Sequence, residues 1–442
     1  MQGHVVAMGL LALVGCGLLI WERMRPQAGD RPAQAATMLG VACAIAALLG
    51  LEGRVTPQTV ALTQDGLARL SGALFLGAAL LDLCYRPVAA ERRPLRYALK
   101  LWGWAGGLLA IVSQDLGLAW LGLALYLLAA QMASGRVAPT RGLLAPAVMG
   151  LGVAMVYMAG ETLDQRLLMA DLWHGGGQPR LLFAGLALLI AGSGVSLGLL
   201  PPREKGGGPP VASALLGVGL LARLGVFTLA PMPAAWSRLL QAMAWITLLY
   251  AAIRMLRSER WDRRLAYVGW VHKSLLLLAL SVVGTRRGLT ALLATALAYL
   301  LGQGLLDRLT RGLGGDPGSA APGGGWLRDR SLHGAALLVA LTSCMGMLFT
   351  LGFSGRIETM AAAQELEAWG GVTAVLLASV CGAVGYVPLI LGLFARPEEE
   401  TEGPEPLGYY GWLAAVLSSA ALVVLGLVRS PLAAWVAWIM AG

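Results

Sequence analysis

Apolar stretches long enough to cross a lipid bilayer recur along the whole of this 442-residue chain. A membrane-spanning helix needs about 20 mostly apolar residues, and so many runs of that length leave no room for a soluble domain. The composition agrees, because 57% of the residues are hydrophobic and only 13% are charged, whereas soluble domains carry about a quarter charged residues. The sequence therefore predicts an all-α integral membrane protein.

Hydropathy divides the chain into about fourteen expected membrane helices. Their expected limits are about 4–21, 36–51, 68–85, 95–112, 116–134, 142–160, 180–199, 211–230, 236–256, 264–283, 287–307, 332–353, 368–395 and 409–428. The longest connection, 308–330, is rich in glycine and is typical of a flexible linker.

Lys and Arg are concentrated in every second connection, beginning with the one after the first expected helix. The positive-inside rule places these connections in the cytoplasm. We therefore expect a multi-pass protein of the bacterial cytoplasmic (inner) membrane, in contact with lipid and with both termini on the outer, periplasmic side. This topology accounts for the net charge of +9, so we expect no nucleic-acid partner.

The cysteines offer no sign of a metal or iron–sulfur site, because none are spaced as such ligands. All five lie in apolar spans: Cys16, Cys43, Cys84, Cys344 and Cys381. We expect them to be inert packing residues. No catalytic residue, metal site or cofactor-binding residue is expected in this chain.

Glycine-rich interruptions mark two of the expected helices. The seventh contains Gly-Ser-Gly-Val-Ser at 192–196 and stops at Pro201-Pro202, and the twelfth contains three glycines within 346–356. If helices 4–8 and 9–13 form two five-helix units, these two helices hold the same place in each. That pairing favours inverted repeats with broken or weakened helices 7 and 12. Ordinary glycine packing between helices is the alternative.

One basic segment resembles a known family. Arg263-Arg264-Leu-Ala-Tyr267, followed five residues later by His272, resembles the Lys-Arg-Leu-Leu-Ala-Tyr-Ser-Ser-Ile-x-His signature of the antiporter-like subunits of respiratory complex I. These subunits are relatives of the multisubunit cation/proton antiporters. Gly355-Arg356 is similar to the family's Gly-Lys in helix 12. The fourteen helices and the end of helix 13 resemble the N-type subunit, in a diverged form.

The resemblance implies a division of the chain into four parts. Residues 1–94 would form N-terminal helices 1–3, and 95–230 would form the first antiporter-like repeat. The second repeat would cover 231–396, and 397–442 would add a C-terminal transmembrane helix.

The family's proton path runs through a Glu in helix 5, a Lys in helix 7, a Lys in helix 8 and a Lys or Glu in helix 12. In this sequence the first three positions fall on Ala119, Ser196 and Leu220, and only Arg356 keeps a cation. None of the expected helices has an Asp or Glu near its centre, although such carboxylates normally mark proton relays in lipid. The resemblance therefore implies a degraded path.

Three further residues are candidates for what remains of a proton path. Arg223 lies one turn past the expected helix 8 lysine, and its guanidinium keeps its proton, so it offers either an electrostatic field or structural hydrogen bonds. His272 matches a family position and titrates near neutral pH. Lys273 titrates when desolvated, but it points about 100° away from His272 on a helix. Pairing with backbone carbonyls or snorkelling is the alternative role for Lys273.

The resemblance implies a non-catalytic, membrane-arm subunit of a proton-translocating NADH:quinone oxidoreductase, bound to the other membrane-arm subunits. Flavin, iron–sulfur clusters and quinone would belong to partner subunits. Two roles stay open: proton conduction through His272, Lys273 and Arg356, or a scaffold that seals and spaces the membrane arm. The missing acids favour the scaffold. The alternative is a subunit of a multisubunit cation/proton antiporter, a membrane-bound hydrogenase or an inorganic-carbon transporter.

Overall fold

The computed structural model is helical throughout the part of the chain that it describes, apart from turns and one isolated β-bridge between Asp115 and Asp164. The described residues are 3–24, 30–50, 65–85, 93–134, 139–174, 179–199, 211–225, 233–258, 261–310, 331–394, 409–428 and 430–441. They form two compact units. Unit 1 comprises Met1–Gly198, Ala212–Pro233 and Ile439–Gly442, and unit 2 comprises Leu199–Val211 and Ala234–Trp438.

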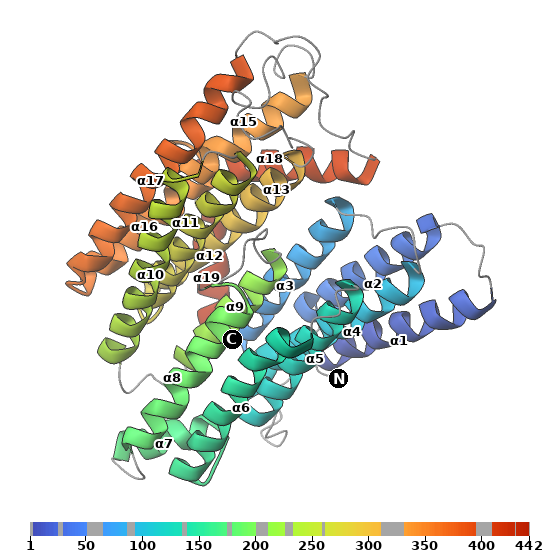
Figure 1. The fold of residues 1–442 in the computed structure, drawn as a ribbon, viewed down its shortest axis with the longest axis vertical. Coiled ribbons are helices and arrows are strands. Elements are labelled where there is room, and N and C mark those ends of the chain that lie inside the picture. The colour runs from blue at the N-terminus through green and yellow to red at the C-terminus, as the bar shows by residue number, and fades with distance from the viewer. Residues whose placement is uncertain are drawn as a thin grey trace. The chain divides into compact units, whose positions relative to one another are not determined.

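Unit 1 is a bundle in which α1 contacts α2 and α4, α4 contacts α5, and α6 contacts α8 (Figure 1). Its helices are α1 (Gly3–Met24), α2 (Asp30–Gly50), α3 (Gly66–Tyr85), α4 (Arg93–Val112), α5 (Leu116–Ser134), α6 (Pro139–Gly160), α7 (Gln165–His174), α8 (Pro179–Ser196) and α9 (Val211–Arg223).

Unit 2 has its own bundle, in which α11 contacts α12 and α17, and α16 contacts α12, α17 and α18 (Figure 1). Apart from the end residues of the first and last helix, it contains α10 (Pro233–Leu256), α11 (Trp261–Ser281), α12 (Arg286–Ala298), the π-helical segment η2 (Tyr299–Gln303), α13 (Gly304–Leu309), α15 (Ser331–Met345), α16 (Leu351–Glu365), α17 (Trp369–Phe394), α18 (Tyr409–Leu427) and α19 (Ser430–Ala441).

Eight of the described helices are long and apolar enough to cross a membrane. Four shorter apolar helices add to them: Pro146–Gly160, Arg180–Ser196, Val211–Arg223 and Leu332–Met345. The expectation of an all-α membrane protein is confirmed. The number fourteen, the inverted repeats and the four-part division of the chain stay predictions.

Two helices were not expected from the sequence. The short α7 follows Asp164, whose Oδ1 accepts a hydrogen bond from the backbone N–H of Arg166 at 2.8 Å, as an N-terminal cap does. The C-terminal α19 begins at Ser430, with Pro431 in its first turn, where a proline is tolerated because it lacks only an N–H that has no helical partner.

Glycine pairs allow some helices of unit 1 to touch backbone to backbone. A Cβ atom at Gly122 of α5 would lie 2.6 Å from the carbonyl oxygen of Gly106 in α4. A Cβ atom at Gly185 of α8 would lie 2.8 Å from the carbonyl oxygen of Gly152 in α6. Small residues at such contacts are typical of helix packing in lipid, where close approach supplies much of the attraction.

The expected interruption of helix 12 is confirmed, because α15 ends at Met345 and α16 begins at Leu351. Gly346 has a φ of 75° and Phe349 a φ of 66°, so the chain turns through two left-handed residues. The N–H of Gly346 donates to the carbonyl of Ser343 and the N–H of Met347 to that of Thr342, both at 3.0 Å. These two bonds form a Schellman motif that ends α15.

The end of helix 7 is described only in part. α8 stops at Ser196, and Gly198 has a φ of 74°, so the helical backbone ends before the expected Pro201-Pro202. That proline pair lies outside the described residues, as does most of the connection to α9.

Candidate functional site

The four proton-path candidates from the sequence lie almost completely inside the helical units. Arg223 is 2% exposed, Lys273 3%, Arg356 6% and His272 7%. Burial of a charge is unfavourable unless hydrogen bonds or an opposite charge compensate it. The contacts of each side chain therefore indicate what it does in the structure.

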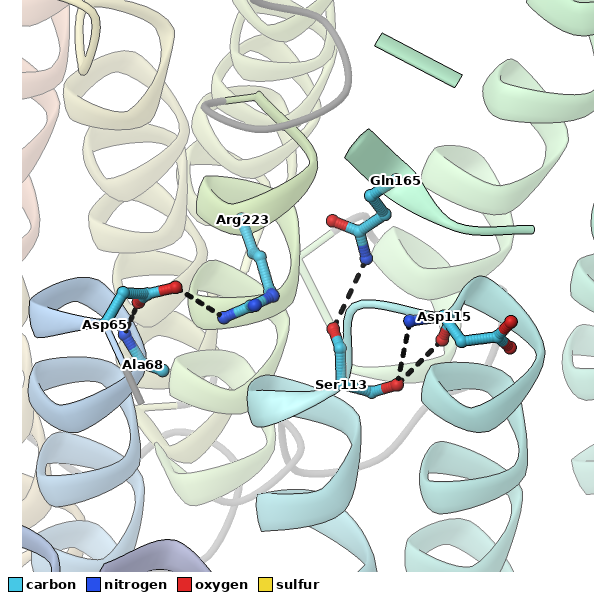
Figure 2. A network of polar contacts seen from close by, with 6 residues as sticks. All are labelled: Asp65, Ala68, Ser113, Asp115, Gln165 and Arg223. Carbon is cyan, nitrogen blue, oxygen red and sulfur yellow. Dashed lines mark hydrogen bonds and ion pairs between the residues drawn. The ribbon is translucent and has the colours of Figure 1, made fainter. Parts of the chain in front are cut away.

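Arg223, the last residue of α9, forms an ion pair with Asp65 at the start of α3. Its Nη1 lies 3.2 Å from Asp65 Oδ2, while Asp65 Oδ1 accepts a hydrogen bond from the N–H of Ala68 at 2.7 Å (Figure 2). One carboxylate thus caps α3 with one oxygen and pairs with the buried guanidinium through the other.

The packing of α9 explains how two residues 158 positions apart come together. A Cβ atom at Gly219 would lie 2.9 Å from the side chain of Ser71 in α3 and 3.5 Å from that of Ile111 in α4. Arg223 follows Gly219 by one turn, so it projects from the same face of α9 toward the ends of α3 and α4.

Hydrogen bonds join the segment that follows α4 to the start of α7. The N–H of Leu116 donates to the carbonyl of Leu163, and the N–H of Gln165 donates to that of Gln114, both at 3.0 Å. The Gln165 carboxamide also donates to the carbonyl of Ser113 at 3.4 Å (Figure 2). These polar groups hold two connections together and are used for structure.

His4 and Gln165 are two buried residues of unit 1 that have side-chain atoms without a protein hydrogen-bond partner. His4 is fully buried and neither ring nitrogen has a hydrogen bond, and Oε1 of Gln165 has none either. The charges of Arg223 and Asp65 act on His4. Such atoms are usually satisfied by buried water.

The three positions that the resemblance aligns with the family's titratable residues, all in unit 1, hold uncharged side chains. Ala119 and Leu220 are buried at 3% and 2% exposure. The hydroxyl of Ser196 donates to the carbonyl of Gly192, one turn earlier in α8, at 2.8 Å. None of the three side chains takes up or releases a proton near neutral pH.

Arg356 and His272 converge on the break between α15 and α16. Arg356 lies in α16 and donates through Nη2 to the carbonyl of Cys344 at 2.6 Å and through Nη1 to that of Met345. His272 Nε2 lies 2.6 Å from the same Cys344 oxygen. Because a carbonyl only accepts, Nε2 carries the proton in this contact.

These contacts complete the C-terminus of α15. The last carbonyls of a helix have no partner within it, and the Schellman motif satisfies only those of Thr342 and Ser343. Arg356 and His272 satisfy the next two, at Cys344 and Met345. Both side chains therefore stabilise the broken helix.

Tyr386 of α17 supports His272 from the other side. Its hydroxyl lies 3.4 Å from Nδ1 of His272, and the two rings stack with centroids 5.9 Å apart. With Nε2 protonated, Nδ1 of a neutral imidazole accepts this contact. The imidazole is thus held in one orientation by α15 and α17 together.

Lys273 points away from this group, as the helical spacing predicts. Its Nζ lies over the indole of Trp270, 3.9 Å from the ring centroid, which is a cation–π geometry. The charge that acts on it is that of Asp307 in α13. Arg356 and His272 bind backbone carbonyls, and Arg223 forms an ion pair with Asp65. Lys273 differs from them, because its contact in the described part of the chain is with an indole ring.

The structure brings together two of the four sequence candidates, His272 and Arg356, and separates Lys273 from them. Arg223 lies in unit 1. Sequence reasoning expected no acid partners because none lies mid-helix, but Asp65 and Asp307 supply them from helix ends. Asp65 precedes α3 in a capping position, and this position could have been predicted from the sequence. Nothing in the sequence indicated that Asp307 would act on Lys273.

A metal site is not evident. Within the ranges given above, no three His, Cys, Asp or Glu side chains are placed to hold a metal ion, and the five cysteines are free.

Comparison with known proteins identifies the family. A model described as "NADH:quinone oxidoreductase/Mrp antiporter, TM" matches residues 113–382, which is more than half of the chain. The chain belongs to this antiporter-like membrane family. It is 30% identical over 424 residues to the NADH-quinone oxidoreductase subunit N of Chromohalobacter salexigens, covering 87% of this chain and 88% of that protein.

Solved structures of antiporter-like subunits share the fold. A chain of respiratory complex I from Thermus thermophilus with bound aureothin matches with a TM-score of 0.78 and 25% identity, over 97% of this chain and 98% of that one. A chain of the Mrp complex from Dietzia sp. DQ12-45-1b matches with a TM-score of 0.79 and 14% identity, over 100% and 97%. A chain of the archaeal membrane-bound sulfane sulfur reductase gives 0.73 and 19%, over 99% and 96%. The expected family membership is confirmed, and the last two matches establish the fold alone.

Proposed function

We propose that this antiporter-like protein is the N-type membrane-arm subunit of a complex I-like NADH:quinone oxidoreductase in a bacterial inner membrane. It contributes to an assembly that couples quinone reduction to proton translocation. Flavin, iron–sulfur clusters and quinone are bound by its partner subunits. The similarity to subunit N over most of both chains supports this assignment.

The Asp65–Arg223 ion pair is the main observation in support of a structural role for unit 1. In unit 1 the family's titratable positions hold alanine, serine and leucine, and the one buried cation of α9 is an arginine with a carboxylate bound to it. A guanidinium keeps its proton at any accessible pH. Unit 1 is therefore a structural, scaffolding half that seals and spaces the membrane arm without relaying protons.

Among the four candidates, Lys273 of unit 2 is the one suited to proton exchange. His272 and Arg356 are held by the carbonyls at the end of α15. Lys273 is an amine, which loses its proton more readily when it is desolvated, and the carboxylate of Asp307 acts on it. The proton transfer that remains to this subunit is thus assigned to the surroundings of Lys273.

The membrane orientation follows from the distribution of positive charge. α13 has Arg308 in its last turn, and the connection after it contains three more Arg, at 311, 328 and 330, so this connection is assigned to the cytoplasm and the two chain termini to the periplasm. Arg287, at the start of α12, pairs with Glu365, at the end of α16, at 3.1 Å. Those two helix ends therefore lie at one side of the membrane, which fits an alternating path of α12 and α16.

Affinity purification tests the assignment. A tagged chain, extracted in a mild detergent, is expected to bring down flavin- and iron–sulfur-containing subunits, and a strain that lacks the chain is expected to lose assembled NADH:quinone reductase. Recovery of the chain with membrane subunits only, together with sodium- or potassium-dependent proton flux in vesicles, would instead identify a cation/proton antiporter. A deletion strain with full NADH-driven quinone reduction would also contradict the proposal.

A further inference from the structure

The helix opposite Lys273 is irregular. Between α12 and α13 the backbone forms the π-helical segment η2, Tyr299–Gln303. A π-bulge redirects the side chains that follow it and occurs frequently at functional sites. Gln303 is the last residue of this segment and is 5% exposed.

Gln303 of η2 packs against the face of α11 from which Lys273 projects. A Cβ atom at Gly269 would be 3.3 Å from Nε2 of Gln303 and 3.7 Å from its Oε1, so the carboxamide rests on the open backbone of Gly269. Residues four apart on a helix project from one face. The Gln303 side chain therefore reaches the strip of α11 from which Lys273 projects one turn later.

Gln303 is joined to Asp307, one turn further along. Its Nε2 donates to Asp307 Oδ1 at 2.7 Å, which fixes the carboxamide and its orientation. Its Oε1 is buried and has no hydrogen-bond donor. A buried acceptor of this kind normally receives a bond from an amine or from ordered water.

Asp307 extends this group toward the end of the helix. It is half-buried in α13, which ends two residues later at Leu309. Its charge acts on Lys273 and reaches Tyr299 and Tyr386 as well. The carboxylate thus lies one turn past Gln303, close to the C-terminal end of α13.

We propose that Lys273, Gln303 and Asp307 form one proton-exchange site that opens toward the cytoplasmic end of α13. A water molecule bound to Oε1 of Gln303 links the Lys273 ammonium to the Asp307 carboxylate. The N–H bond of Lys273 breaks, the water passes a proton on, and an O–H bond forms on Asp307. The ammonium and the carboxylate become a neutral amine and a carboxylic acid, so charge and atoms balance.

Each residue has a separate task in this site. Lys273 and Asp307 carry the proton, and Gln303 is a positioning residue that orients the water without titrating. The inference deepens the proposed function and rests on it, because it requires that Lys273 exchange protons during turnover. It also gives Lys273 the acid partner that the mid-helix positions do not provide.

Proton uptake by inverted membrane vesicles tests the site, with NADH as the electron donor and quinone reduction followed on the same sample. Asp307→Asn keeps the oxygen that binds Gln303 but removes the proton acceptor, and Gln303→Leu removes the water-binding oxygen. Each is expected to lower proton uptake about tenfold or more, the scale on which a positioned acid or base contributes. Asp307→Glu is expected to restore most of it.

Glu365→Gln is the matched control, because it removes a carboxylate from the same unit at an exposed position. It is expected to leave proton uptake unchanged, and the amount of assembled complex on native gels confirms folding for every variant. If Lys273→Ala loses proton uptake while Asp307→Asn and Gln303→Leu keep it, the site is wrong. If Lys273→Ala itself keeps normal uptake, the proposed function of Lys273 fails instead.

Discussion

Arg223, His272 and Arg356 are used as hydrogen-bond donors to fixed partners at helix ends. Arg223 binds a capping aspartate, and the other two satisfy carbonyls at the broken end of α15. A donor held by a helix carbonyl or a capping carboxylate stabilises the fold, and an arginine in that position does not release its proton. Lys273 differs from all three, because its ammonium lies over the indole of Trp270 and the carboxylate of Asp307 acts on it.

The Asp65–Arg223 pair can be tested without disturbing the cap of α3. Asp65→Asn keeps an oxygen that accepts from Ala68, since asparagine caps helices as well as aspartate does. It leaves the buried guanidinium without its counter-charge, so we expect a loss of stability of about 3 kcal/mol. Thermal inactivation of the detergent-solubilised complex measures this loss.

The same change at another capping aspartate, Asp115→Asn, is the control for that experiment, because it also retains the cap of its helix. It is expected to alter stability only slightly. Equal thermal midpoints for the two variants would show that the ion pair does not stabilise unit 1. The complex that does assemble with Asp65→Asn is expected to translocate protons normally.

At the scale of helices, glycine contacts determine how closely the elements of unit 1 approach. Gly185→Val would place a Cβ atom 2.8 Å from a backbone oxygen of α6 and 2.9 Å from a methyl group of Val156. Because α6 and α8 must then separate, we expect a loss of about 1–3 kcal/mol. The thermal midpoint of the purified complex checks this expectation.

Gly17→Val in α1 serves as the matched control, since a Cβ atom at Gly17 has no neighbour within 4 Å. Both changes put the same β-branched residue into a helix interior, so the difference between them isolates the packing contact. A midpoint for Gly185→Val equal to that of Gly17→Val would contradict the close approach of α6 and α8.

Most long helices were predictable because a bilayer-length apolar run has few alternatives in lipid. The break in helix 12 was also predictable, since Gly346 supplies a residue for the left-handed turn. Its second left-handed residue, Phe349, was not, because a bulky side chain gives no such signal. Neither was η2, because a π-bulge is set by packing against the neighbouring helices.

The candidate site was predictable in its cations and unpredictable in their partners. A Lys, His or Arg within an apolar run is conspicuous in the sequence, and the four candidates were found in that way. Their partners come from distant segments: Asp65 lies 158 residues from Arg223, and Cys344 lies 72 residues from His272. Such pairings depend on tertiary packing, and no local pattern encodes them.

At the scale of the whole molecule, the proposed function gives the two units of this antiporter-like subunit different tasks. Unit 1 has alanine, serine and leucine at the positions that the resemblance aligns with the family's titratable residues, together with the Asp65–Arg223 ion pair. Unit 2 keeps a broken helix, closed by Arg356 and His272, and one buried amine. The proposed function accordingly assigns a supporting role in assembly to unit 1 and places proton exchange within unit 2.

The most direct test of this account is NADH-driven proton uptake by vesicles that contain Lys273→Arg. Arginine retains the positive charge and the stacking on Trp270 but does not release its proton. If Lys273 exchanges protons, the variant assembles and its proton uptake falls about tenfold or more. Wild-type proton uptake in fully assembled Lys273→Arg complex would show that the subunit is a scaffold throughout, and would contradict the central claim.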